Sequence, residues 1–96
     1  MYGTVARMKV KRENLEALRE AMNEVERRPG DGYVATHILV PDEWHEEVLV
    51  AVFFEDRKAY LKNANDPKMD EDYRRFRAFL EADPEWTDGE WESHEA

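Results

Sequence analysis

Runs of apolar residues along the chain mark its predicted strands and helices. The longest run is VLVAVFF, residues 48–54, in which seven apolar residues lie between the acidic pairs Glu46–Glu47 and Glu55–Asp56. Because successive side chains of a strand point to opposite faces, both faces of this segment would be apolar. Its short length and its β-branched and aromatic content favour a strand over a buried helix. We therefore predict a central strand that is covered on both faces.

Three further segments alternate between apolar and other positions and are predicted to be strands. They are Tyr2–Val10, Tyr33–Val40 and Trp86–Trp91, the last of which is weakened by Asp88-Gly89. Strict alternation along the second segment would place four side chains together on one face, namely Tyr33, Ala35, His37 and Leu39.

Apolar residues three and four apart predict the helices. Residues Arg12–Arg27 carry such a stripe, with Asn14 as a candidate N-cap, and Pro29–Gly32 would end this helix. A short helix is predicted over Arg57–Ala64, capped by Asp56.

A third helix is predicted to restart after this short one. Asp66 would be its N-cap and Pro67 its first residue. Its apolar stripe runs from Met69 to Leu80, and Ala82-Asp83-Pro84 would end it.

The predicted element order is β-α-β-β-α-α-β, which indicates an α+β, ferredoxin-like domain. Right-handed crossovers give one four-stranded antiparallel sheet, with the strands in the order 4-1-3-2 and the helices on one face. At 96 residues, the chain is expected to be a single domain, residues 1–96. The helix-free apolar face of the central strand would be open to water in a monomer, and such a surface usually marks an interface. We therefore expect a homodimer.

Composition and net charge limit the kinds of partner and the compartment that we expect for this protein. A formal net charge of −9 argues against nucleic acid and against anionic membranes. The sequence contains no Cys and no apolar run near 18 residues, so we expect a soluble, cytoplasmic protein. Residues 81–96 carry seven acidic residues and no Lys or Arg, which fits a solvated terminus or an acidic binding tail.

The stretch FFEDRKAYLKNANDPKMDEDYRRFRAFLEADPEW, together with the opening strand Tyr2–Val10, resembles the antibiotic biosynthesis monooxygenase (ABM) family. The resemblance implies a dimeric α+β barrel, in which two sheets face each other across a homodimer. It also implies a cofactor-independent monooxygenase that acts on an aromatic or quinol-like small molecule. Two alternatives stay open: a non-catalytic small-molecule-binding protein of the same fold, and a purely structural subunit. A cavity with polar groups converging at its end would favour the enzyme.

Candidate site residues lie around the break between the two later helices. Tyr60, Asn63 and Tyr73 match the region that forms a pocket between helices and sheet in ABM-like monooxygenases. The resemblance implies that they could donate hydrogen bonds to a ligand oxygen. The alternative is structural, with Tyr73 packed in the core and Asn63 capping a helix end.

His37 is the candidate base, because the unperturbed pKa of histidine, ~6.5, suits proton transfer near neutral pH. The alternative for His37 is a hydrogen-bonded residue in the dimer interface.

The three histidines of the chain have no metal-ligand spacing, so no metal is expected. The haem-degrading branch of the family places a His on the last long helix, and residues 68–82 contain none. No haem or other cofactor is therefore expected.

Overall fold

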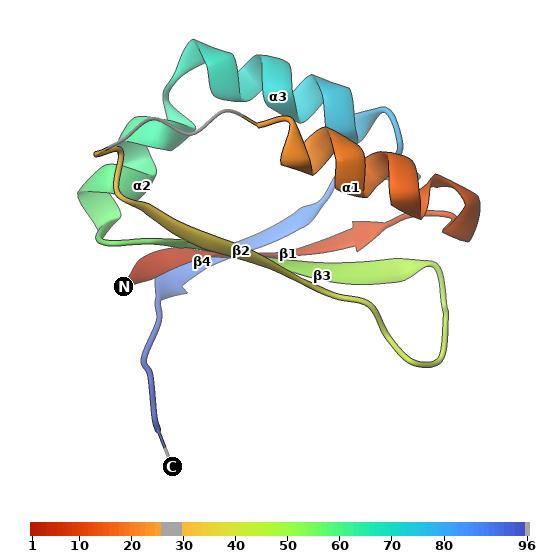
Figure 1. Cartoon of the computed structure of the whole chain (residues 1–96), viewed down its shortest axis with the longest axis horizontal. Coiled ribbons are helices and arrows are strands. Elements are labelled where there is room, and N and C mark those ends of the chain that lie inside the picture. The colour runs from red at the N-terminus through yellow and green to blue at the C-terminus, as the bar shows by residue number, and fades with distance from the viewer. Residues whose placement is uncertain (26–29, 96) are drawn as a thin grey trace.

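A computed structural model describes residues 1–25 and 30–95 of the chain. Figure 1 shows a layer of helices lying over one face of a twisted sheet. The elements of the described part are, in chain order, β1 (Tyr2–Lys9), a 3₁₀ turn (Arg12–Asn14), α1 (Leu15–Asn23), β2 (Tyr33–Leu39), β3 (Glu47–Phe54), α2 (Arg57–Ala64), α3 (Pro67–Arg77) and β4 (Glu85–Glu90). None of the helices described is long and apolar enough to cross a membrane.

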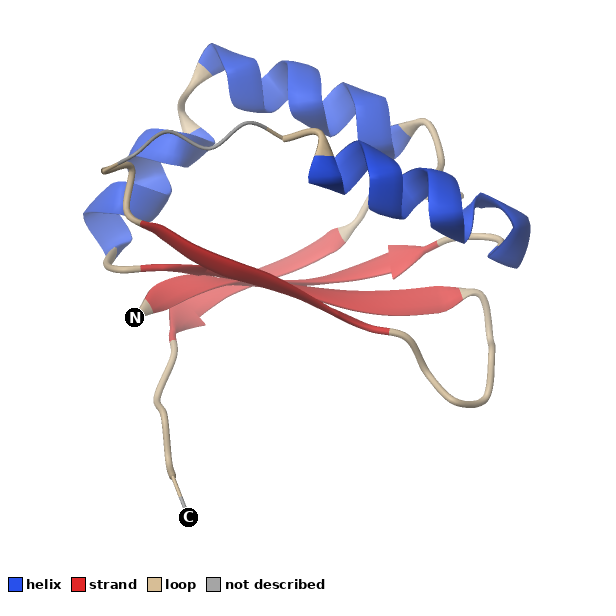
Figure 2. Cartoon of the chain, viewed as in Figure 1, coloured by secondary structure: helices blue, strands red, loops and turns tan. Residues whose placement is uncertain are grey.

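The four strands form one antiparallel sheet in the order β2-β3-β1-β4, which confirms the predicted topology. β1 lies between β3 and β4, so that Thr4 faces Val52 on one side and Asp88 on the other. Figure 2 shows α1, α2 and α3 on one face of this sheet and no helix on the other. The fold is therefore the predicted α+β, ferredoxin-like arrangement.

The core lies between the helices and the sheet. Alternate residues of β1 and β3 point into it, and α1 and α3 cover them with one apolar face each. The fully buried side chains include Met8, Val48 and Phe54 from the strands and Leu18 from α1. Burying each such side chain contributes roughly 1.5–3 kcal/mol, so this layer supplies most of the stability of the fold.

Two helix N-termini are capped as the sequence predicts. The Asp56 carboxylate accepts a hydrogen bond from the Ala59 backbone N–H at 2.8 Å, and that of Asp66 accepts one from Lys68 N–H at 2.9 Å. Pro67 occupies the first turn of α3, where its missing N–H costs nothing. These caps fix the break between α2 and α3, which in turn sets the positions of the residues around it.

The helix boundaries differ from the prediction at both ends of α1 and at the end of α3. α1 begins at Leu15 after the 3₁₀ turn and ends at Asn23, and the predicted end at Arg27 lies outside the described residues. α3 ends at Arg77 instead of continuing to residue 82. Beyond it the backbone tightens, because Leu80 N–H bonds to the Arg77 carbonyl, and the Arg77 side chain donates to the Leu80 carbonyl at 3.1 Å.

A β-bulge in β2 changes which side chains share a face. Tyr33 pairs with Phe54 and Ala35 pairs with Phe53, so Val34 is an extra residue in the ladder. Tyr33 therefore lies on the helix side of the sheet, and the prediction that it shares a face with His37 is wrong. Strict alternation fails at the point where one residue is inserted.

The helix-free face is apolar at its centre and only partly covered. Leu49, Ala51 and Phe53 of β3 point to this side and are half-buried. The Trp91 ring packs over Phe53 with a centroid separation of 4.7 Å, while Leu39 stays 60% exposed. Residues 91–95 leave the sheet on this side, as Figure 1 shows.

Candidate functional site

A cavity of about 690 Å³ lies between the helices and the helix side of the sheet. Its walls are largely apolar, with Ile38, Val52 and Phe54 from the strands and Met69 and Phe76 from α3. The polar side chains that line it are Thr4, Asn23, Tyr33, Thr36, Tyr60, Asn63, Asp70, Tyr73, Trp86 and Asp88. A volume of this size is typical of small-molecule sites in proteins.

Tyr60 and Asp88 form a hydrogen-bonded pair on the cavity wall. The Tyr60 hydroxyl donates to Asp88 Oδ1 at 2.8 Å, which joins α2 to the edge strand β4. The Tyr60 ring is held between two other aromatic rings, those of Tyr2 and Phe54, at centroid separations of 5.3 and 5.7 Å. Because Asp56 caps the helix that carries Tyr60, the position of this ring follows from the local sequence.

Electrostatics keep Tyr60 protonated. Burial and then the hydrogen bond and negative charge of Asp88 raise the pKa of Tyr60 to about 12. Both causes disfavour the phenolate, because it would lose hydration and would face a carboxylate. At neutral pH Tyr60 is therefore a neutral phenol, and its single hydrogen is given to Asp88.

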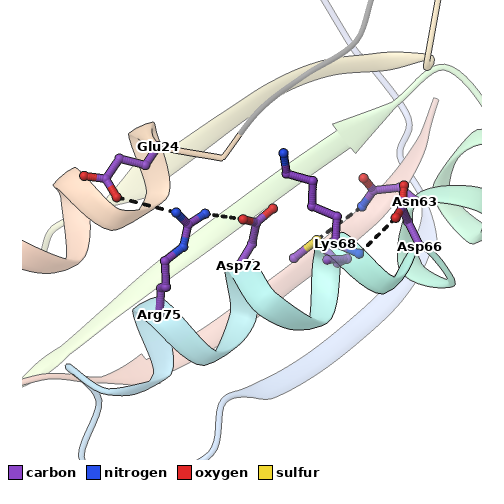
Figure 3. A network of polar contacts seen from close by, with 7 residues as sticks. Glu24, Asn63, Asp66, Lys68, Asp72 and Arg75 are labelled. Carbon is purple, nitrogen blue, oxygen red and sulfur yellow. Dashed lines mark hydrogen bonds and ion pairs between the residues drawn. The ribbon is translucent and has the colours of Figure 1, made fainter.

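Asn63 and Tyr73 lie on either side of the break between α2 and α3. Asn63 Nδ2 contacts Met69 Sδ at 3.6 Å, close to the Asp66 cap, as Figure 3 shows. Tyr73 packs edge-on against the buried Phe76 ring, at a centroid separation of 5.3 Å. The structure thus brings Tyr60, Asn63 and Tyr73 into the lining of one cavity.

An ionic network holds α3 to α1 above the sheet. Arg75 donates a hydrogen bond to the buried Asp72 carboxylate and forms an ion pair with Glu24, 3.8 Å away (Figure 3). Asp72 is satisfied within the protein, because the Arg75 charge offsets its burial. We assign this network a structural role in keeping the helices in place over the cavity.

His37 lies apart from the other three candidates. It is exposed on the helix-free face, where its ring contacts Phe53 edge-on at a centroid separation of 5.5 Å. It does not line the cavity. Within the described chain, no group of three or more His, Asp or Glu side chains is arranged to hold a metal ion.

Sequence reasoning missed several polar lining residues that the strands bring in, among them Thr4, Tyr33 and Asp88. Thr4 and Asp88 face each other across β1 and β4 although they are far apart in the chain. Tyr33 enters the cavity through the bulge, and its hydroxyl lies 2.7 Å from Thr36 Oγ1. One signal was available for Asp88, because aspartate is disfavoured inside a strand and needs a local reason to be there.

Comparisons with known proteins agree with this fold. A family model described as antibiotic biosynthesis monooxygenase matches residues 1–82. A search of curated proteins finds no match.

Several solved structures share the fold at low sequence identity. SnoaB, a cofactor-independent oxygenase from Streptomyces nogalater, superposes with a TM-score of 0.76 at 16% identity, covering 97% of this chain and 94% of that one. A protein of Mycobacterium tuberculosis gives a TM-score of 0.73 at 14% identity, covering 99% and 98%. A conserved protein from Methanosarcina mazei gives 0.70 at 14% identity, covering 92% and 89%. At these identities, the likeness establishes the fold.

Proposed function

Because the chain belongs to the antibiotic biosynthesis monooxygenase family, we propose that it is a cofactor-independent monooxygenase of an aromatic or quinol-like small molecule. The observation that carries this proposal is the cavity, whose largely apolar walls also carry the hydroxyls and amide of Tyr60, Tyr73 and Asn63. Apolar walls suit a planar ring system, and a few polar groups fix its orientation. A cavity of this size also argues against a purely structural subunit.

The proposed reaction oxidises an electron-rich carbon of the substrate with molecular oxygen. The substrate first loses a proton, and its anion then gives electrons to oxygen. When a ring CH₂ becomes a carbonyl, one oxygen atom enters the product, and the other leaves as water with the two hydrogens. The protein would hold the substrate, stabilise its anion and exclude water.

Asn63 and Tyr73 are the proposed anion-stabilising residues, since an amide N–H and a phenolic O–H both donate hydrogen bonds. Tyr60, which lies on α2 together with Asn63, would orient the substrate. His37 is not included in this site, because its side chain is on the other face of the sheet.

We also propose that the protein is a homodimer through its helix-free sheet face. Half-buried Leu49 and Phe53 and the exposed Leu39 give that face an apolar centre. A second copy would remove this surface from water. His37 would then lie in the interface, in keeping with its structural interpretation.

The test of the monooxygenase is oxygen uptake with dihydroxynaphthalenes and anthrones. We expect uptake by the wild-type protein and a loss of about 10²-fold or more in kcat/KM for Asn63→Ala and Tyr73→Phe, the scale of a removed hydrogen-bond donor. Asn65→Ala is the matched control, because Asn65 is exposed and does not line the cavity. Equal activity in all these variants would refute the site.

A non-catalytic ligand-binding protein is the second candidate. It is favoured by the Tyr60–Asp88 hydrogen bond, which already satisfies the Tyr60 donor inside the protein. Binding of the same aromatic compounds without any oxygen uptake would establish this candidate instead.

A further inference from the structure

The hydroxyl groups of Tyr60 and Thr4 both donate their hydrogens to acceptors within the protein. An ionised carboxylate only accepts hydrogen bonds, so the hydrogen in the 2.8 Å Tyr60–Asp88 contact must come from Tyr60. Thr4 Oγ1 donates its own hydrogen to the Thr87 carbonyl at 3.1 Å. What these two hydroxyls offer to a ligand is therefore oxygen lone pairs.

These acceptors are gathered at one place by the strand register. Thr4 of β1 pairs with Asp88 of β4, whose carboxylate accepts the Tyr60 hydrogen bond. All three residues line the cavity. The Asp88 carboxylate adds a negative charge and a second acceptor oxygen to the same place. We call Thr4, Tyr60 and Asp88 the acceptor cluster.

We propose that the acceptor cluster recognises a hydroxyl group that the ligand keeps protonated, and that Asp88 sets this preference by holding the Tyr60 hydrogen. The inference rests on the proposed function in taking an aromatic ligand for the cavity. It adds that the ligand carries a neutral, hydrogen-bond-donating hydroxyl at this end, apart from the carbon that would be oxidised.

The cluster should discriminate between ligands of the same shape. A ligand hydroxyl can donate a hydrogen bond to the cluster. A methyl ether oxygen has no hydrogen to donate, finds no donor in the cluster and loses its hydrogen bond to water. A carboxylate would in addition be repelled by Asp88. Loss of one hydrogen bond should weaken binding by about tenfold.

The experiment compares three naphthalene probes by calorimetric titration: 2-naphthol, 2-methoxynaphthalene and 2-naphthoate. We expect the wild-type protein to bind 2-naphthol about tenfold more tightly than 2-methoxynaphthalene, and 2-naphthoate most weakly. In Asp88→Ala the Tyr60 hydrogen is released and can be donated, so the naphthol-to-ether ratio should fall towards one and 2-naphthoate should gain affinity.

Two further variants test whether the naphthol preference comes from hydrogen-bond acceptors or only from negative charge. Glu90→Gln is the charge control, since Glu90 is exposed on the same strand and does not line the cavity, and it should leave the ratio unchanged. Tyr60→Phe removes an acceptor without changing the charge and should also reduce the ratio. Circular dichroism checks that each variant is folded.

The outcomes decide between the two proposals. Equal wild-type affinity for naphthol and ether, an unchanged ratio in both Asp88→Ala and Tyr60→Phe, or no binding of any probe would overturn the recognition of a hydroxyl. The protein could show a clear preference for naphthol that depends on Asp88 and yet take up no oxygen. That result would support recognition of a ligand hydroxyl and contradict the proposed monooxygenase activity.

Discussion

Gly3 and Gly89 face each other across β1 and β4, yet their surroundings differ sharply. A Cβ atom at Gly3 would lie 1.8 Å from the Val52 carbonyl oxygen and 3.1 Å from Trp91 Nε1, whereas at Gly89 it would meet nothing within 4 Å. The Val52 oxygen belongs to the backbone of β3 and cannot rotate away, so β1 or β3 would have to move.

We expect Gly3→Ala to lower the free energy of unfolding by roughly 1–3 kcal/mol, the usual cost of overpacking. Gly89→Ala, the matched control, should stay within about 0.5 kcal/mol of the wild type. Urea unfolding measures both. Equal stability of the two variants would show that the close approach of β3 to Gly3 is not a constraint.

Ionisation of Tyr60 should lower the free energy of unfolding at alkaline pH. Its pKa rises to about 12 in the folded protein through burial and Asp88, against about 10 in an unfolded chain. Below pH 10 both states keep the proton, and its stabilising effect is complete. As pH rises from about 10 to about 12, the unfolded chain releases a proton that the folded protein retains, so stability falls.

Unfolding midpoints measured across this pH range should fall less steeply in Tyr60→Phe than in the wild type. Titration of the phenolate absorbance should also lose its highest-pH step in that variant. In Asp88→Asn the step should move back towards pH 10, because two of the causes of the raised pKa are removed. A titration step that is unaffected by either substitution would contradict this assignment.

Among the elements, α1 and α2 begin in different ways. Asp56 closes the first turn of α2 with its 2.8 Å bond to Ala59 N–H, while Asn14 holds the same position in α1 without a side-chain cap bond. Asp56→Ala should therefore destabilise the protein by roughly 0.5–2 kcal/mol. Asn14→Ala should cost less, and a larger loss for Asn14 in chemical denaturation would reverse the order of the two caps.

The elements also show how far sequence reasoning reaches. Capping residues and apolar period predicted α2, the start of α3 and every strand, because these signals are local. The bulge at Val34 and the early end of α3 depend on pairing and side-chain contacts made elsewhere. The candidate site divides in the same way: Tyr60 and Asn63 lie beside a predictable helix break, whereas Asp88 joins them only through the pairing of β4 with β1.

At the scale of the whole molecule, the uncovered sheet face determines how the chain should assemble. We expect the wild-type protein to have twice the 11.4 kDa mass of one chain in light scattering at micromolar concentration. Leu49→Asp, at the centre of that face, should give a monomer or an unfolded chain. Leu61→Asp is the control, since Leu61 lies exposed on α2, away from the sheet face. A stable wild-type monomer would contradict the proposed homodimer.

The extra residue at Val34 also has a consequence for how this protein can change during evolution. The bulge puts Tyr33 on the side of the cavity and His37 on the opposite side, although both positions are odd-numbered in one strand. Loss of the Val34 codon would place Tyr33 directly before Ala35 and restore regular alternation, with Tyr33 still opposite Phe54 on the cavity side. An in-frame deletion of three nucleotides would therefore remove the bulge while Tyr33 keeps its place in the cavity wall.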